Sequence, residues 1–387
     1  MDAKELPVRK FECLSCKHTD YRMSTREVGE IVPNECPRCK GNMQVVGAEY
    51  PNWLVELLGF VSKHFDVLDF AAVDGRIEAE VTAQDPKSSF RALLNLSKPY
   101  GYLPAMREKN GELRLALFRS PNAKTGNIAI NLLLIVATFL TTFAAGYFFI
   151  FGNISQAALF SCAIMLMLGV HEMGHKIAAW RNGVEATMPY FIPAPTYWGT
   201  FGAVISIKSP IPTKEALVEL GASGPLLGFF VALPLTVVGL MLSKPDPQGT
   251  ALLFTPAIFA VLQVLTFGSV PAAMRFNPLA IAGWLALFVT MLNLIPAGQL
   301  DGGHIARGLL GRERHYTLTR ILGFVLLLTF IPFPDLPLWI YGFIIILLFR
   351  GYHQGALDDV SGLSGHQKLL AVAAIVVFIL CLPLPAG

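Results

Sequence analysis

Long apolar segments occupy the chain from about Lys124 onward, whereas polar and charged residues dominate before that position. A helix crosses the hydrocarbon core of a bilayer with about 20 predominantly apolar residues. The pattern therefore predicts an N-terminal region outside the membrane and a polytopic membrane region after it. The clearest predicted spans are Ile128–Phe151, Gln156–Arg181, Leu217–Leu242, Pro278–Leu300 and Leu369–Leu384.

Three further apolar segments are harder to assign. Ile321–Phe333 and Leu336–Phe349 are short, and the segment Pro332–Asp335 predicts a tight turn between two short or tilted helices. Ala251–Met274 is ambiguous, and we expect a re-entrant or surface-lying segment there because a complete crossing would disturb the charge pattern of the loops. The predicted fold class is a predominantly α-helical membrane protein with about six or seven transmembrane helices.

The loop charges predict an orientation because Lys and Arg concentrate on the cytoplasmic side of a membrane. With the N-terminus inside, only Lys244 and Arg275 fall outside, and the opening residues contain no apolar segment typical of a secretory signal. We expect a multi-pass protein of the cell membrane with its N-terminus and soluble domains in the cytoplasm. The cations assigned to the cytoplasmic side are Arg181, Lys208, Lys214, Arg307, Arg312, Arg314, Arg320, Arg350 and Lys368.

Composition agrees with a membrane protein, since hydrophobic residues make up 53% of the 387 positions. The formal net charge of +3 is too small to indicate a nucleic-acid partner. The lipid bilayer is therefore the expected environment, and no nucleic acid is expected to bind.

An HExxH pattern, His171 to His175, follows directly on a stretch from Thr125 to Val170 that contains no Asp, Glu, Lys or Arg. On a helix, residues four apart share one face, so both histidines can bind one metal ion while Glu172 reaches a nearby water. The alternative is a pair of packing histidines, but ionisable residues at membrane depth are costly and usually functional. The pattern predicts a metal site inside the membrane.

A catalytic zinc site needs a third protein ligand, and Asp301 is the candidate. It ends the apolar run that begins at Asn293, in which Pro296 and Gly298 loosen the helix. A broken helix can turn a carboxylate into the interior of a helix bundle. The alternative is a helix C-cap in which Asp301 faces the cytoplasm.

The two motifs together resemble the site-2 protease family of intramembrane metalloproteases, in the branch shared by prokaryotes and plant chloroplasts. That family pairs HExxH with a later N-x-x-P-x-x-x-L-D-G pattern, matched here by Asn293 to Gly302. A Gly-Pro pair in the intervening helix is matched by Gly224 and Pro225, although Gly228 stands where many members have an Asn. The resemblance covers roughly Gly126 to Leu348.

The resemblance implies that His171, His175 and Asp301 bind zinc and that Glu172 is the general base. Glu172 would take a proton from the attacking water and deliver it to the leaving amine. Asn293, about two helical turns before Asp301, is a candidate donor to the oxyanion of the intermediate. Its alternative role is a hydrogen bond between two helices.

The segment Met188–Lys208 is rich in proline, glycine and aromatic residues and should not be helical. Site-2 protease relatives place short β structure here, and Gly202–Lys208 has the composition of a strand. A strand edge beside the site could hold an unwound substrate by β-augmentation. The alternative is a loop that caps the helix bundle.

The N-terminal region contains a second metal pattern, two C-x-x-C pairs separated by 19 residues. This spacing is typical of a four-thiolate structural zinc site, and a ribbon-like module is predicted. Two disulfides are the alternative, but a cytoplasmic location disfavours them. The four ligands would be Cys13, Cys16, Cys36 and Cys39.

A small α+β soluble domain is predicted between the ribbon and the membrane region, with Asn110-Gly111 as a hairpin signal. It could present substrates or bind a regulatory partner. The predicted elements are Trp53–Phe65, Ile77–Thr82, Lys87–Leu96, Tyr100–Glu108 and Glu112–Ser120. The predicted domains are the ribbon at 1–48, the α+β domain at 51–120, the protease-like core at 126–350, and a cytoplasmic loop with a C-terminal transmembrane helix at 351–387.

The function expected from the resemblance is zinc-dependent endoproteolysis in or near transmembrane segments of other proteins, with one catalytic and one structural zinc ion. One alternative is a membrane transporter in which the same ligands bind metal ions in transit. Glu172 argues against it, since transport has no evident need for a base beside the first ligand. A catalytically inactive membrane scaffold is the second alternative.

Overall fold

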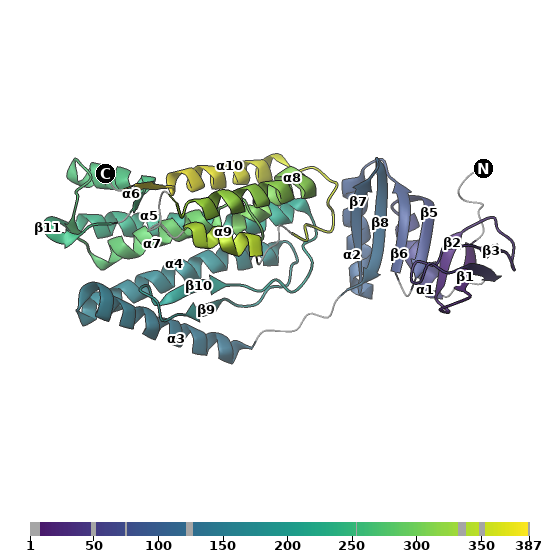
Figure 1. The fold of residues 1–387 in the computed structure, drawn as a ribbon, viewed down its shortest axis with the longest axis horizontal. Helices are drawn as coiled ribbons and strands as arrows, with labels where there is room; N and C mark the ends of the chain where they lie inside the picture. The colour runs from purple at the N-terminus through teal and green to yellow at the C-terminus, as the bar shows by residue number, and fades with distance from the viewer. Residues whose placement is uncertain are drawn as a thin grey trace. The chain divides into compact units, whose positions relative to one another are not determined.

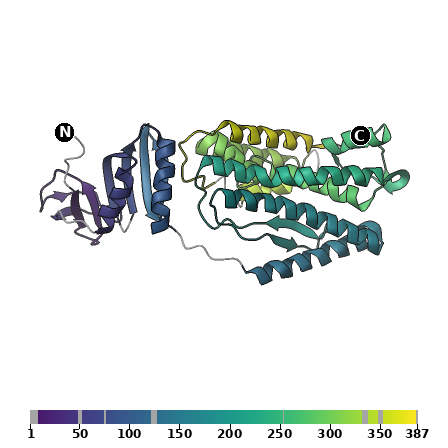
Figure 2. The same ribbon diagram turned by 180° about the vertical axis from the view of Figure 1, so that it is seen from behind.

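The computed structural model describes residues 8–47, 52–73, 76–120, 127–252, 254–331, 338–347 and 353–385. It divides into two compact units (Figures 1 and 2). The N-terminal unit comprises Met1–Asn122 together with Leu357–Gly362. The helical unit comprises Ala123–Ala356 and Leu363–Gly387.

An antiparallel sheet of eight strands in the order β3-β4-β1-β2-β5-β6-β8-β7 runs through the N-terminal unit (Figure 1). The ribbon and the α+β domain, which the sequence pattern separates, share this sheet because Tyr21 and Arg22 pair with Ala72 and Ala71. The strands are β1 (Val8–Cys13), β2 (Thr19–Met23), β3 (Ile31–Val32), β4 (Met43–Gly47), β5 (Asp66–Val73), β6 (Arg76–Thr82), β7 (Tyr102–Lys109) and β8 (Glu112–Arg119).

Two helices, α1 (Asn52–Ser62) and α2 (Pro86–Ser97), bury apolar residues in the core of this unit. A short 3-10 turn, η2 (Lys98–Tyr100), follows α2. Asn110 and Gly111 have φ values of 56° and 82° and join β7 to β8 in the hairpin that the sequence predicts. Strand β5 is an addition to the predicted elements.

The segment Leu357–Gly362 adds to the free edge of β7. The backbone N–H of Met106 donates to the Leu357 carbonyl at 2.8 Å, and the Asp359 N–H donates to the Met106 carbonyl at 3.2 Å. The Leu357 side chain packs into the core of the N-terminal unit. A stretch from the C-terminal part of the chain therefore completes a sheet built from the N-terminal part.

Within its described residues, the helical unit contains three helices that are long and apolar enough to cross a membrane. They are α3 (Ile128–Ala145) with its π-helical continuation η3 (Gly146–Phe151), α4 (Ile154–Arg181) and α5 (Lys214–Met241). The other helices are α6 (Ala257–Phe267), α7 (Pro278–Asn293), α8 (Asp301–Leu328), α9 (Leu338–Leu347) and α10 (Gly365–Leu380).

The largest differences between helix boundaries and predicted spans lie on either side of Asp301. The span predicted over Pro278–Leu300 ends as a helix at Asn293, and α8 starts at Asp301 after a turn in which Gly298 has a φ of 57°. Asp301 therefore begins a helix instead of ending one. Helix α8 starts 20 residues before the predicted Ile321, and Gly311, with φ 77° and ψ −177°, interrupts it.

The predicted turn at Pro332–Asp335 lies outside the described residues. The described part of the ambiguous segment Ala251–Met274 contains the 11-residue helix α6. Three two-stranded pairs complete the helical unit. They are β9 (Tyr190–Pro193) with β10 (Thr200–Val204), β11 (Lys244–Thr250) with β13 (Met274–Arg275), and β12 (Phe254–Pro256) with β14 (Pro383–Pro385).

Candidate functional site

Two histidines on α4 and an aspartate on α8 meet inside the helical unit. His171 and His175 lie one turn apart, with their Nε2 atoms separated by 3.1 Å. The Oδ2 atom of Asp301 lies 3.3 Å from each Nε2. All three predicted ligands are thus brought together, although 126 positions separate Asp301 from His175 in the chain.

These distances fit a single metal ion. Two tetrahedral ligand atoms, each about 2.1 Å from zinc, lie about 3.4 Å apart. Two imidazole nitrogens and one carboxylate oxygen also form a donor set that zinc accepts. His171, His175 and Asp301 can therefore bind one zinc ion and leave a fourth position open.

The orientation of His175 is set by a backbone carbonyl. Its Nδ1 lies 2.7 Å from the oxygen of Leu220 on α5, so Nδ1–H donates there and the Nε2 lone pair is left for a metal. Such a partner fixes the tautomer and the ring plane of a metal-binding histidine.

Helix α5 passes close to all three ligands because it presents glycines to them. A Cβ at Gly224 would collide with the imidazole of His175, and one at Gly228 would lie 3.2 Å from Nδ1 of His171. A Cβ at Gly221 would lie 2.5 Å from the backbone oxygen of Asp301. The glycine at 228, where many relatives have an Asn, therefore stands beside a metal ligand.

Glu172 is buried with the two histidines, and these three side chains are 6–7% exposed. Its carboxylate lies within 4.8 Å of both histidine donor nitrogens. Ile205, which follows β10, lines the same cavity as this carboxylate. Glu172 therefore lies beside the ligand cluster in a position to accept a proton from a water there.

Asn293, the last residue of α7, also reaches the cluster. Its Nδ2 lies 3.4 Å from Nε2 of His171. An amide N–H at this place could donate to an oxygen beside the ligands. The turn between Asn293 and Asp301 packs closely on the start of α8, since a Cβ at Gly303 would lie 2.6 Å from the Ala297 carbonyl oxygen.

A cavity of about 230 Å³ contains these groups. Ala203 and Val204 of β10 line it together with His171, Glu172 and Asp301. Sequence reasoning missed two further lining residues, Gln299 and His304. The spacing of three residues between Asp301 and His304 is a signal that could have indicated His304, because residues i and i+3 share a helix face.

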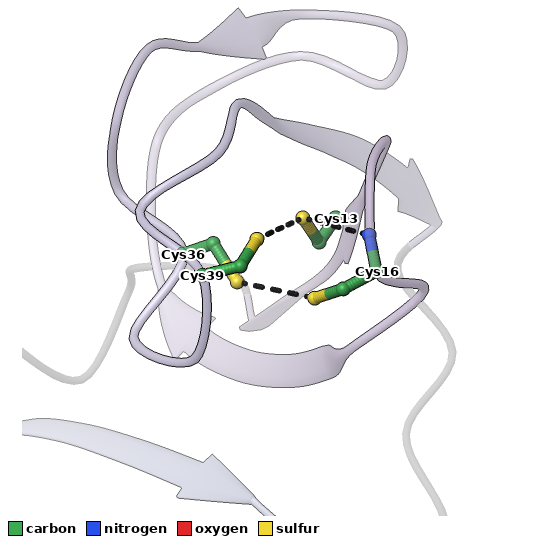
Figure 3. Close-up of side chains that lie close together, drawn as sticks. All are labelled: Cys13, Cys16, Cys36 and Cys39. Atoms are coloured by element: carbon green, nitrogen blue, oxygen red, sulfur yellow. Dashed lines mark hydrogen bonds between the residues drawn. The ribbon is translucent and has the colours of Figure 1, made fainter.

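The four cysteines of the N-terminal unit form a second cluster, and Figure 3 shows their side chains converging. Their sulfur atoms lie within 4.8 Å of one another, with Cys13 and Cys39 at 3.5 Å and Cys16 and Cys36 at 3.6 Å. These cysteines are free, and the sulfur separations match a tetrahedral four-thiolate zinc site with Zn–S bonds of about 2.3 Å.

A backbone hydrogen bond favours the thiolate form of Cys13. The N–H of Cys16 lies 3.5 Å from the sulfur of Cys13, and this contact lowers the pKa of the Cys13 thiol to about 6. Lys17 and Lys40, which follow the two C-x-x-C pairs, both have a φ of 58° and turn the chain back. The two turns present all four sulfurs to one point.

Comparison with known proteins finds similarity over the part of the chain that carries the cluster on α4 and α8. Residues 159–330 match peptidase family M50. The probable zinc metalloprotease EGY2 of Arabidopsis thaliana chloroplasts is 32% identical over 235 residues, which cover 57% of this chain and 40% of that protein. The probable zinc metalloprotease EGY1 of the same organism is 31% identical over 229 residues, which cover 57% and 41%.

The chain thus spans about two fifths of the length of these curated relatives. Among solved structures, the site-2 protease from Methanocaldococcus jannaschii aligns with 64% of this chain and 86% of its own, at 17% identity and a TM-score of 0.30.

Proposed function

We propose that this chain, whose residues 159–330 match peptidase family M50, is a zinc-dependent intramembrane endopeptidase. Its substrates would be other membrane proteins, cleaved in or near their transmembrane segments. The observation that carries the proposal is the convergence of His171, His175 and Asp301 beside Glu172 in one cavity of an apolar helix bundle. The names of the relatives support zinc and proteolysis.

Glu172 and Asn293 have separate parts in peptide hydrolysis, beside the zinc that the three ligands would hold. Zinc, when bound, polarises the scissile carbonyl and lowers the pKa of a water toward about 7. Glu172 accepts the proton of that water as its oxygen bonds to the carbonyl carbon, and it passes the proton to the amine when the C–N bond breaks. The Nδ2–H of Asn293 donates to the oxyanion that forms in between.

The position of strand β10 supports the proposal that the substrate binds in an extended conformation. It pairs with β9 on one edge, and Ala203 and Val204 line the cavity. A transmembrane helix must unwind before its carbonyl groups become accessible, and the second edge of β10 offers backbone groups for the unwound segment. The alternative, in which the β9–β10 hairpin only caps the bundle, predicts that changes along β10 leave cleavage unaltered.

The N-terminal unit would carry one structural zinc ion in its four cysteines. Its sheet could present substrates or bind a regulatory partner. We place this unit in the cytoplasm and the helical unit in the cell membrane with about six or seven crossings, because the loop cations favour that orientation. Cysteine accessibility labelling on intact cells tests the placement.

The test is cleavage of a panel of tagged single-span membrane proteins by the purified chain in liposomes. Wild type is compared with Glu172→Gln, and with His366→Gln as a control on an exposed histidine of α10. We expect wild type and His366→Gln to cleave and Glu172→Gln to be inactive with its zinc retained. Cleavage by Glu172→Gln at the wild-type rate would overturn the proposed role. Zinc flux through liposomes without cleavage would favour transport. Absence of both cleavage and zinc flux would favour a scaffold.

A further inference from the structure

Three histidines form a group at and behind the cavity wall. His304 lies on α8 three residues after Asp301 and lines the cavity, while His315, further along α8, and His353, between α9 and α10, are 1% and 7% exposed. The rings of His304 and His353 lie 4.7 Å apart between centroids, and those of His315 and His353 lie 5.5 Å apart. None of the three has a part in the hydrolysis described above.

Hydrogen bonds determine where the protons of this group reside. The backbone N–H of Gly355 donates to Nδ1 of His353 at 2.9 Å, so that nitrogen carries a lone pair. A neutral His353 therefore has its proton on Nε2. This Nε2–H lies 2.8 Å from Nδ1 of His304 and must donate to it.

The hydrogen bond from His353 also determines the tautomer of His304. Its Nδ1 accepts from His353 and cannot hold a proton, so the proton of the neutral ring is on Nε2. Burial, together with the nearby His304, His315 and Arg307, lowers the pKa of His353 and agrees with its neutral form. His304 consequently offers an N–H at Nε2 and no lone pair.

The Nε2–H of His304 is available in the cavity. Among the described residues no partner is recorded for it, and it is not among the fully enclosed side-chain atoms that lack one. Because this N–H is not enclosed by protein, it can donate to an acceptor that enters the cavity. A backbone carbonyl of an extended peptide is an acceptor that fits beside β10.

We infer that His304 donates a hydrogen bond from Nε2 to a backbone carbonyl of the substrate next to the scissile bond, and that His353 is a positioning residue that fixes the His304 tautomer. This inference rests on the proposed function. It assigns a different task to His304 than to Asn293, whose Nδ2 lies 3.4 Å from Nε2 of His171 and is the proposed donor to the oxyanion. A flanking carbonyl is bound alike before and during the reaction, so the contact affects KM more than kcat.

Paired Gln and Leu variants distinguish the effect of the N–H donor from the effect of the volume of the imidazole ring. His304→Gln keeps an N–H near the position of Nε2, whereas His304→Leu removes it. In the same way, His353→Gln keeps a donor toward His304 and His353→Leu removes it. His366→Gln is the control, since this histidine is exposed and lies outside the cavity.

We expect His304→Leu and His353→Leu to raise KM by about 3- to 10-fold with kcat within about threefold of wild type, the range of one neutral hydrogen bond. Both Gln variants and His366→Gln should stay near wild type, and all should retain zinc. An unchanged KM in His304→Leu would overturn the substrate contact. Loss of zinc in His304→Leu would show instead that His304 supports the metal site.

The tautomer of His304 can be measured without an activity assay. In ¹⁵N-histidine-labelled protein, protonated and unprotonated ring nitrogens give separate NMR shifts, and the His304 signals are those missing from His304→Gln. We expect Nε2 protonated and Nδ1 unprotonated in wild type, and a tautomer mixture in His353→Leu. The reverse assignment in wild type would overturn the inference even if no substrate is cleaved, and failure of Glu172→Gln to differ from wild type would instead overturn the proposed function.

Discussion

Gly224 of α5 lies directly against the metal-binding edge of His175 on α4. A Cβ at Gly224 would collide with Nε2, the atom that faces Asp301. At the same crossing, a Cβ at Gly174 would lie 2.6 Å from the Ser223 carbonyl oxygen. The two helices can therefore approach closely only because both carry glycine there, and this approach brings the Leu220 carbonyl to His175.

Gly224→Ala should displace His175 from the ligand cluster. Overpacking of a closely packed site costs about 1–3 kcal/mol, which corresponds to about a 5- to 160-fold loss of zinc affinity at the membrane site if the whole cost falls on the bound form. Zinc content and cleavage rate measure this loss. Gly365→Ala is the matched control, since the added Cβ there meets no atom within 4 Å. Equal zinc affinity in both variants would contradict the close approach.

Asp301→Asn and Glu172→Gln should have different effects because Asp301 is the proposed ligand and Glu172 the proposed base. Asp301→Asn replaces a charged ligand and should remove zinc from the helical unit. Glu172→Gln should retain zinc and lower kcat by about 10²- to 10⁴-fold, the usual contribution of a general base. Zinc analysis beside single-turnover kinetics distinguishes the two, and zinc retention by Asp301→Asn would exclude it as a ligand.

Cys36→Ser should lower the zinc content of the chain by one ion and unfold the region around the four cysteines. A small β module of this kind depends on its metal for folding. Elemental analysis and limited proteolysis report the two effects. Cys162→Ser is the control, because Cys162 lies exposed on α4. A disulfide in place of the metal site would show as resistance of Cys36 to thiol labelling after zinc is chelated.

Leu357→Ala should loosen the edge of the N-terminal sheet. Leu357 is 7% exposed, and removal of a buried leucine side chain costs about 2–4 kcal/mol. Hydrogen exchange of β7, measured by mass spectrometry, should rise. Leu68→Ala makes the same deletion at a residue that is 41% exposed and should leave exchange unchanged. Equal exchange in both variants would argue against the strand addition.

Stability should fall when the pH drops below about 6.5, in part through His353. Burial, with the neighbouring His304, His315 and Arg307, lowers the pKa of the folded His353. The unfolded chain therefore binds a proton below about pH 6.5 that the folded chain does not, which favours unfolding. His353→Gln should show a smaller drop in unfolding temperature between about pH 7.5 and about pH 5.5. An identical drop would mean that His353 titrates normally.

The sequence predicted local features correctly where the participating residues are close in the chain. The spacing of His171 and His175 requires only one helical turn, and Asn110-Gly111 requires only a turn with positive φ. The pairing of Asp301 with the histidines was anticipated from the motif, but its position at the start of α8 was not. Pro296 and Gly298 end the apolar run as a helix earlier than hydrophobicity indicates.

The sequence by itself determined the long apolar helices and the candidates for the metal ligands and the base, because these depend on composition and on short motifs. Only the tertiary structure decided that the ribbon and α+β strands form one sheet, that Leu357 completes it, and that His353 fixes the proton of His304. Each of these depends on hydrogen bonds between groups far apart in the chain, and such pairing follows from packing rather than from any local pattern.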